Sequence, residues 1–521
     1  MKAHTHGFFI GSLVCFVAGA VLEGAALAQE FVGGNIPVVT AEGFQSGPSA
    51  AGNTSNGEFM VVWHGQRDAA SSVFEILGRR IGPDASLIGD PVSLSPAGSF
   101  TPDIAYNSID DEYLVVYARG GIFGRRVAAD GSPMGAEITI FANISQSLPA
   151  VAHNSQTNEY LVVWGQSAGG VRGRIIGASG APVSAVQLLS GTQVGAGNPA
   201  VAFNSVANEY LAVWDAFAAP FFPSVTDIFG LVIGSSGAPA TGIFNITTAD
   251  ELQAFPTVTH NATANQYLVL WADNRNLATT SGDVFGQLIE ASGALAGPNV
   301  PVSTLPFNEL APSVAYAAAT DQYLAVWWGQ PSGGPPITDV FARLLGPDGT
   351  PADDAVRVSE SAAAQPFTHV ASNPATHQLL VSWPDDRNAE GSSTDVFAQL
   401  IAVRPPVIHV VIDIKPGSFP NSINLGSTGA VPVAILSDAN FDATQVDPAT
   451  VTLANASIGL KGNGSFMASF EDANSDGLLD LVVHVSASAL QLTAGDTQAA
   501  LAGRTFEGRQ INGSDSVRVV P

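Results

Sequence analysis

The segment NSQTNEYLVVWGQ, residues 154–166, decides the fold because close variants of it recur along the chain. The variants include NSVANEYLAVWDA at 204–216, NATANQYLVLWAD at 261–273 and AAATDQYLAVWWG at 317–329. Each begins with a polar turn and continues as a run of apolar and aromatic residues. This order is typical of a hairpin turn that leads into a buried strand.

Aligned on its last aromatic residue, the segment occurs seven times at spacings of 47 to 57 residues. The aromatic residues are Trp63, Tyr117, Trp164, Trp214, Trp271, Trp327 and Trp383. A proline stands fifteen residues before the aromatic residue in six copies: Pro48, Pro102, Pro149, Pro199, Pro256 and Pro312. An asparagine stands ten residues before it in six copies: Asn53, Asn107, Asn154, Asn204, Asn261 and Asn373. A period near fifty residues indicates a solenoid, a propeller or an array.

Each copy contains four strand-like runs; in the third copy they are AVAHN, EYLVVWG, VRGRIIG and AVQLLS. The seventh copy has three runs and then RPP at 404–406, whereas the segment at 36–40 precedes the first copy as an unmatched strand. A strand from the N-terminal end can therefore complete the seventh sheet, which removes the free sheet edges. We predict an all-β fold: a seven-bladed β-propeller of four-stranded blades over 29–404, its last blade closed by the N-terminal strand.

The motif NEYLVVW, followed by DIFG and GAP, resembles the secreted β-propeller repeats of bacterial extracellular proteins. After residue 404 the repeat stops. IDIKPGS (412–418) and FEDANSDGLLDLVVHV (470–485) resemble a β-rich module found at the C-terminus of extracellular bacterial and archaeal proteins. The resemblance implies a small β-sandwich-like domain over 405–521 and an extracellular location; it implies no activity.

The N-terminal residues 1–28 are expected to be a signal peptide, with Lys2, an apolar run and ALA at 26–28. The one cysteine, Cys15, lies in that segment, so disulfides and thiol chemistry are not expected in the mature chain. The net charge of -26 and the presence of only three lysines argue against nucleic-acid binding. We expect a monomeric protein without membrane insertion that is secreted, extracellular or periplasmic.

The segment DANSDGLLD at 472–480 matches the first nine positions of a calcium-binding loop. The predicted oxygen ligands occupy alternate positions on a tight turn: Asp472, Asn474, Asp476, the main-chain carbonyl of Leu478, and Asp480. Position twelve is Val483, where an EF-hand has glutamate, so Glu471 or Asp413 would have to complete the shell. Ca²⁺ is the predicted cofactor, and the alternative is a solvated turn without metal.

The loops after the second strand open with similar residues in two copies, WADNRN at 271–276 and WPDDRN at 383–388. One hypothesis is a polar rim for a ligand, made by Asp273, Arg275, Asp385 and Arg387. The alternative is architectural: each arginine pairs with the aspartate that opens the third strand, Asp283 or Asp395.

No motif of a hydrolase nucleophile, a zinc protease or a phosphate-binding loop is present in the sequence. The first hypothesis for function is therefore an extracellular binding or structural protein that presents a loop face to a glycan or a protein. The second is a propeller-fold carbohydrate-active enzyme, a glycoside hydrolase or polysaccharide lyase. The two differ in whether acidic groups converge at the axial mouth of one face.

Overall fold

The computed structural model describes residues 29–520, apart from 41–42, 67–72, 143–147, 167–169, 218–224, 281, 332–337, 360–366, 389–393, 404–406 and 507. The expected signal peptide lies outside these residues. The chain divides into two compact units, 28–405 and 406–521. The described residues form strands and two short 3-10 helices, with no α-helix among them.

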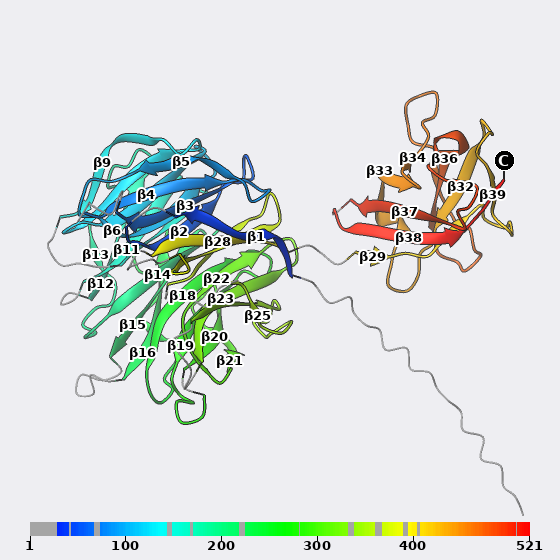
Figure 1. Ribbon diagram of the computed structural model, residues 1–521. Coiled ribbons are helices and arrows are strands. Elements are labelled where there is room, and N and C mark those ends of the chain that lie inside the picture. The colour runs from blue at the N-terminus through cyan, green and yellow to red at the C-terminus, as the bar shows by residue number, and fades with distance from the viewer. Residues whose placement is uncertain are drawn as a thin grey trace, which may run out of the picture. The chain divides into compact units, whose positions relative to one another are not determined.

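The larger unit consists of four-stranded antiparallel sheets, and in six of them the strands follow in chain order (Figure 1). The first three contain β2 (Gln45–Gly52), β3 (Phe59–Gly65), β4 (Glu75–Ile81), β5 (Leu87–Ser93); β6 (Phe100–Asn107), β7 (Glu112–Ala118), β8 (Ile122–Ala128), β9 (Pro133–Phe141); and β10 (Pro149–Asn154), β11 (Glu159–Gln166), β12 (Gly170–Gly177), β13 (Gln187–Leu188). The next three contain β14 (Gly197–Asn204), β15 (Glu209–Phe217), β16 (Thr226–Gly234), β17 (Phe244–Asn245); β18 (Gln253–Asn261), β19 (Gln266–Asp273), β20 (Asp283–Glu290), β21 (Leu295–Ser303); and β22 (Phe307–Ala317), β23 (Gln322–Pro331), β24 (Asp339–Leu345), β25 (Val356–Arg357).

The last sheet of this unit combines the two ends of its chain. It contains β26 (His369–Asn373), β27 (Gln378–Asp385), β28 (Asp395–Val403) and, at its outer edge, β1 (Gln29–Val39). The pairing of β1 with β28 is antiparallel, with Ile36 opposite Ala398, and the two strands lie side by side in Figure 1. The predicted use of the N-terminal strand to complete this sheet is therefore confirmed.

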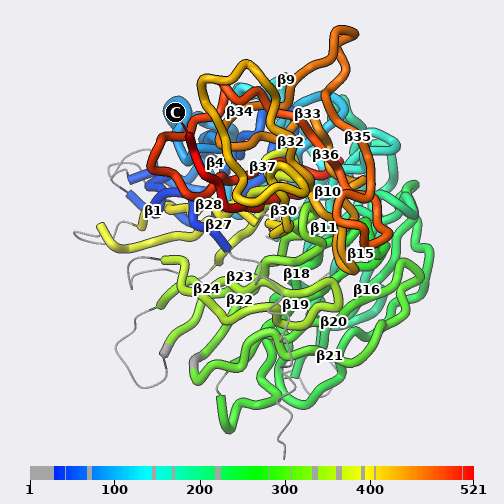
Figure 2. The backbone as a smooth tube through the Cα atoms, turned by 90° about the vertical axis from the view of Figure 1, so that its right-hand side faces the viewer, coloured from blue at the N-terminus to red at the C-terminus, as the bar shows by residue number. Residues whose placement is uncertain are grey.

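The cores of the larger unit lie between consecutive sheets. Each of seven apolar clusters combines residues of two sheets that follow one another, and one of them joins the last sheet to the first. The repeated aromatic residue is fully or almost fully buried in every copy and packs against the preceding sheet; Trp63 shares a cluster with Leu380 and Val396. The first strand of each sheet contacts the first strand of the next sheet, in the order β2, β6, β10, β14, β18, β22 and β26, and β26 contacts β2. Figure 2 shows neighbouring strands such as β19, β20 and β21 in sequence order. The unit is propeller-like.

The repeated asparagine links one sheet to the next through the turn of the first hairpin. Its Oδ1 accepts hydrogen bonds from main-chain N–H groups two and three residues later; Asn204 accepts from Val206 (2.9 Å) and Ala207 (2.8 Å). In five of the six copies its Nδ2 donates to the side chain of a left-handed residue in the next sheet's turn. These pairs are Asn53 with Asp111, Asn107 with Asn158, Asn154 with Asn208, Asn204 with Asn265, and Asn261 with Asp321, at 2.7 to 3.1 Å. Asn373 instead donates to the main-chain carbonyls of Asn53 and Glu58. The motif that decides the fold is thus an inter-sheet connector.

The smaller unit contains two larger sheets around one apolar core. One sheet is formed by β29 (Ile408–His409), β38 (Gln510–Ser516), β37 (Gln498–Thr505), β33 (Val446–Leu453) and β34 (Ala456–Ser457). The other contains β30 (Ile412–Ile414), β32 (Ala430–Ile435), β36 (Asp480–Ser486) and β35 (Ala468–Glu471). A third pair is β31 (Ser422–Asn424) with β39 (Arg518–Val520), and the 3-10 helices are Ala443–Gln445 and Ala487–Ala489.

Candidate functional site

A cavity of about 460 Å³, here called the mouth, opens where the first strands of the larger unit begin. Every one of the seven sheets contributes to it, through the start of its first strand. The lining residues are Phe44, Ser46, Gly47, Pro48, Ser49, His64, Thr101, Pro102, Asp103, Leu148, Pro149, Asn198, Pro199, Phe255, Pro256, Ala311, Pro312, Phe367, Thr368 and His369. All six repeated prolines are in this set. Thr368 takes their place in the seventh sheet.

The residue before each repeated proline has an unusual backbone conformation at the mouth. Five of these six residues have a positive φ: Gly47 (59°), Thr101 (48°), Asn198 (43°), Phe255 (55°) and Ala311 (45°). Phe367 (80°), which precedes Thr368 in the seventh sheet, has one as well. Five of the first strands also shift register at this point. A left-handed residue before proline is disfavoured, and such strain often accompanies a functional site. The position before the repeated proline, or before Thr368, thus lies at the rim of the mouth, and it carries a side chain in six of the seven sheets, Gly47 being the exception.

These rim side chains differ from sheet to sheet, although the proline after them recurs. Three of them are large and apolar: Leu148, Phe255 and Phe367 are 40%, 37% and 52% exposed. Phe44 adds a further exposed ring to the lining. A framework that repeats while one displayed position varies is suited to recognising a ligand without sevenfold symmetry.

The polar floor of the mouth is a set of hydrogen bonds among four first strands, β2, β6, β10 and β26. Ser49 Oγ donates to Asp103 Oδ1 at 2.7 Å, and the Val151 N–H donates to Asp103 Oδ2 at 2.8 Å. The Ala50 N–H donates to His369 Nδ1 at 3.2 Å, which leaves the proton of the neutral imidazole on Nε2, 3.5 Å from Ser49 Oγ. A catalytic triad requires the histidine to take the proton of the serine. The imidazole of His369 cannot do so, because its nitrogen near Ser49 already carries a proton.

Aromatic rings surround His64 on the same face. Its ring lies 5.8 to 6.3 Å from the rings of Phe44, Phe74 and Phe100, measured between centroids. Burial lowers the pKa of His64 to about 4, and burial also lowers the pKa of His369 against the opposing charge of Asp103. Both imidazoles are therefore uncharged at neutral pH.

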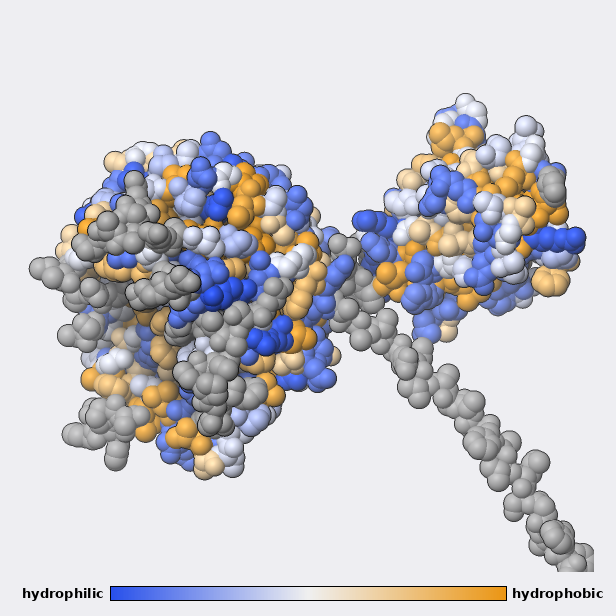
Figure 3. Space-filling view, viewed as in Figure 1, coloured by the Kyte–Doolittle hydropathy of each residue, from blue (hydrophilic) through white to orange (hydrophobic). Residues whose placement is uncertain are grey.

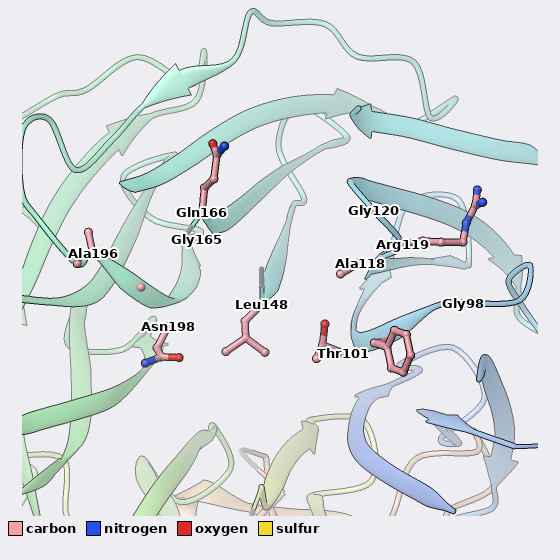
Figure 4. A pocket seen from close by; sticks show the side chains of 13 residues that line it. Gly98, Thr101, Ala118, Arg119, Gly120, Leu148, Gly165, Gln166, Ala196 and Asn198 are labelled. Carbon is pink, nitrogen blue, oxygen red and sulfur yellow. The ribbon is translucent and has the colours of Figure 1, made fainter. Parts of the chain in front are cut away.

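A second pocket of about 370 Å³ adjoins the mouth, with which it shares Thr101, Leu148 and Asn198. Its walls come from the second, third and fourth sheets, as Figure 4 shows. Five glycines lie among its lining residues: Gly98, Gly120, Gly165, Gly195 and Gly197. Arg119 is the one charged residue of the lining; it pairs with Glu137 and stands 4.6 Å from the ring centre of Phe123.

The predicted polar rim has a different role in the structure. Asp273 is fully buried, and its Oδ2 accepts from Trp271 Nε1 at 2.7 Å. Arg275 donates to the same carboxylate from Nε (2.9 Å) and Nη2 (2.7 Å). Its guanidinium carbon lies 4.0 Å from the ring centre of Phe285. The charged groups of Asp273 and Arg275 are therefore used inside the sheet, which gives no support to a ligand role.

The same arrangement recurs in the last sheet. Trp383 Nε1 donates to Asp385 at 2.9 Å, and Arg387 donates to that carboxylate from Nε at 2.9 Å and from Nη2 at 2.6 Å. The architectural alternative named Asp283 and Asp395 as the arginine partners, and this was wrong. Their carboxylates accept instead from Asn276 at 2.8 Å and Asn388 at 3.0 Å. An arginine can donate two hydrogen bonds to an aspartate two residues before it without spanning the loop. Arg275 and Arg387 therefore pair with Asp273 and Asp385 and not with the aspartates across the loop.

The predicted calcium loop connects β35 to β36. Its turn has positive φ at Ser475 (64°) and Gly477 (89°). Asp472 accepts from the N–H groups of Asp476 and Gly477, both at 3.0 Å. Asn474 and Asp476 are exposed beside it, and Asn474 Nδ2 donates to Asp476 Oδ2 at 2.9 Å.

Asp480 differs from the other predicted ligands because it is fully buried. Its Oδ1 accepts from the Ser437 N–H (2.8 Å) and its Oδ2 from the Ala473 N–H (2.9 Å), so it fastens the loop to the unit. Glu471 is the partner of Asp480 in the β35–β36 ladder. Among the described residues, no group of three or more His, Cys, Asp or Glu side chains is placed to hold a metal ion. Calcium binding stays a prediction.

The mouth was not predicted as a site from the sequence, although a signal for it was present. The repeated proline indicates where in each copy the mouth lies, and the variable residue before it indicates the position of the rim. The long loops after the second strands drew the prediction instead; parts of them, at 218–224, 332–337 and 389–393, lie outside the described residues.

No family model matches the chain, and none of the curated proteins matches it. Among solved structures, it is similar to Chaetomium thermophilum Raptor, with a TM-score of 0.45, 13% identity, and coverage of 72% of this chain and 29% of that one. It is also similar to KlHsv2 with loop 6CD replaced by a Gly-Ser linker (TM-score 0.39, 8% identity, 66% and 91% covered). A third structure is a GH62 hydrolase in complex with xylotriose (TM-score 0.29, 9% identity, 44% and 84% covered). The chain thus spans less than a third of the Raptor chain.

Within the described part of the chain, no helix is long and apolar enough to cross a membrane. On the face shown in Figure 3, hydrophilic and hydrophobic residues are interspersed over each unit. The repeated four-stranded antiparallel sheets fit a β-propeller-like repeat protein.

Proposed function

We propose that the chain is a secreted or surface-associated binding protein whose larger unit is one seven-bladed β-propeller, closed by β1. The ligand, a glycan or a protein, enters the mouth. The clusters between consecutive sheets, including the one between the last and the first, support the closed arrangement. The observation that carries the functional proposal is the cavity itself, which is lined by residues of all seven sheets and by a side chain at the variable position of six of them.

A binding role is favoured over glycoside hydrolysis by the acidic groups of the mouth. Glycoside hydrolysis uses two carboxyl groups about 5 to 10 Å apart. Among the described residues that line the mouth, Asp103 is the one carboxylate, and it accepts a hydrogen bond from the Ser49 hydroxyl. The enzyme hypothesis would require a second acid from outside this lining.

The test uses the chain from Gln29 onward in a glycan array and in a pull-down from extracellular material. The double variant Phe255→Ala, Phe367→Ala should lose at least ten-fold in affinity for the captured ligand, because it removes two rim rings. Phe470→Ala is the matched control, since Phe470 is 48% exposed on β35 of the smaller unit. Unchanged capture by the double variant would refute the mouth as the site, and release of a cleaved product would favour the enzyme.

We further propose that Ca²⁺ rigidifies the smaller unit at the loop 472–480. Asp472, Asn474 and Asp476 offer oxygens around one turn, and the Leu478 carbonyl and water would complete a shell of six to eight. Addition of Ca²⁺ should raise the Tm of the unmodified chain, and the rise should be smaller in Asp476→Ala. Asp442→Ala, which removes another turn-capping carboxylate of this unit, should leave that gain intact. An equal calcium response in the unmodified chain and Asp476→Ala would contradict the assignment.

A further inference from the structure

The mouth has one formal charge that no basic residue of its lining offsets. Among the described residues that line it, Asp103 is acidic and none is lysine or arginine. Its two histidines are uncharged at neutral pH because burial lowers the pKa of both. Arg119, in the adjoining pocket, is already paired with Glu137. The mouth therefore combines a net negative floor with an apolar rim.

We propose that the mouth recognises an organic cation, an ammonium group carried on an apolar body, with the ammonium at Asp103 and the body against the phenyl rings of the rim. This inference rests on the proposed binding role of the mouth, and it names an ammonium-bearing molecule as the ligand class in place of the glycan. It deepens the binding role without requiring any chemistry at Ser49.

The Asp103 carboxylate can accept such a ligand while keeping its present partners. Each of its oxygens accepts one hydrogen bond, from Ser49 or from Val151, and a carboxylate offers about four acceptor positions. Asp103 is partly exposed and lines the cavity. An ammonium group brings three donors and no acceptor, so it complements a floor whose free positions are acceptors.

The rim supplies the second half of the recognition. Phe44, Phe255 and Phe367 line the mouth and each is more than a third exposed. Phenyl faces attract cations and bury hydrocarbon, and both effects favour an apolar ammonium over a neutral sugar. The net charge of -26 draws cations toward the protein and repels anions.

The ammonium group has two possible sources with the same chemistry, a small amine and a lysine side chain of a protein. The first arm of the test measures phenethylammonium against 2-phenylethanol, which has the same body without the charge. The second arm measures an acetyl-Phe-Lys-amide peptide against the same peptide with an acetylated lysine. Binding to the unmodified chain is measured by calorimetry at pH 7.5 and low salt.

In at least one arm, the charged probe should bind ten-fold or more tightly than its neutral partner, and Asp103→Asn should abolish that preference. Asp90→Asn is the matched control, because Asp90 is an exposed residue of β5 and its substitution changes the net charge equally. In the arm that shows this preference, Phe367→Ala should weaken the binding of both the charged probe and its neutral partner. Equal binding of charged and neutral probes in both arms, or a preference that survives Asp103→Asn, would overturn the inference.

The comparison on the unmodified chain does not depend on any variant's folding. Failure of the cation preference, with capture still lost in Phe255→Ala, Phe367→Ala, would overturn this inference and leave the proposed function standing. Failure of both measurements would remove the mouth as a binding site.

Discussion

The hydrogen bonds between sheets predict losses of stability of very different size for one substitution at two equivalent positions. Asn204 and Asn261 are both fully buried, and both accept two turn N–H groups through Oδ1. Their Nδ2 groups donate to different partners: the Asn265 amide at 2.9 Å and the Asp321 carboxylate at 2.9 Å. Replacement by aspartate keeps the turn in both cases and changes only the contact with the next sheet.

At Asn204→Asp, the amide of Asn265 can turn its NH₂ group toward the new carboxylate, so the loss of stability should be about 1 kcal/mol or less. At Asn261→Asp, two carboxylates meet about 3 Å apart. Like charges at that separation repel by about 5 kcal/mol at an effective dielectric constant near 20. Proton uptake by the introduced carboxyl limits the loss to ~4 kcal/mol at pH 7, whereas the loss reaches about 5 kcal/mol at pH 8.

The Asn261→Asp loss should also depend on pH. The repulsion raises the pKa of the introduced carboxyl in the folded state, so the folded chain holds a proton that the unfolded chain has released. Stability is then retained near pH 4 and falls as pH rises through the raised pKa. Urea unfolding followed by circular dichroism at pH 4.5 and pH 8 measures both effects. Equal losses for the two variants at pH 8 would refute the inter-sheet hydrogen bonds.

Two further predictions concern buried aromatic and histidine side chains. Trp327→Phe should cost about 1 to 3 kcal/mol more than Trp164→Phe in urea unfolding, because Trp327 Nε1 donates to buried Glu309 at 2.7 Å whereas Trp164 Nε1 has no hydrogen-bond partner among the described residues; similar losses would contradict this reason. His64→Phe should reduce the loss of stability between pH 6.5 and pH 4 by at most about 3 kcal/mol, because the folded-state pKa near 4 makes the unfolded chain bind the proton first. An unchanged acid transition would show that His64 is not desolvated.

The fold of the larger unit could be predicted from sequence because the proline and the asparagine stand at the same distances from the repeated aromatic residue in most copies. Pairing of residues 36–40 with the last copy followed from one missing strand and one surplus strand, and β1 lies where that argument puts it. The order of residues in the repeat predicted a buried strand, and the six tryptophans at its repeated aromatic position are each buried between two sheets.

The mouth could not be predicted in the same way because it is made where the copies disagree. Residues such as Leu148 and Phe367 are far apart in sequence, and only the arrangement of the sheets in space brings them to one cavity. The prediction of a polar rim from the Asp–Arg pairs gained no support for a related reason. Arg275 and Arg387 sit at loop starts that look like a rim, yet a carboxylate two residues away and a phenyl ring in the next strand hold the guanidinium in place.

Occupancy of the mouth is the most direct test of the account, and the chain permits it because no cysteine follows residue 28. Leu148→Cys places a single thiol at the rim, and Val206→Cys places one in an exposed hairpin turn at the other end of a first strand. Maleimide labelling is measured with and without the captured ligand. The account predicts that ligand slows labelling of Leu148→Cys at least ten-fold and leaves Val206→Cys unchanged. Equal labelling rates of Leu148→Cys in both conditions would contradict it.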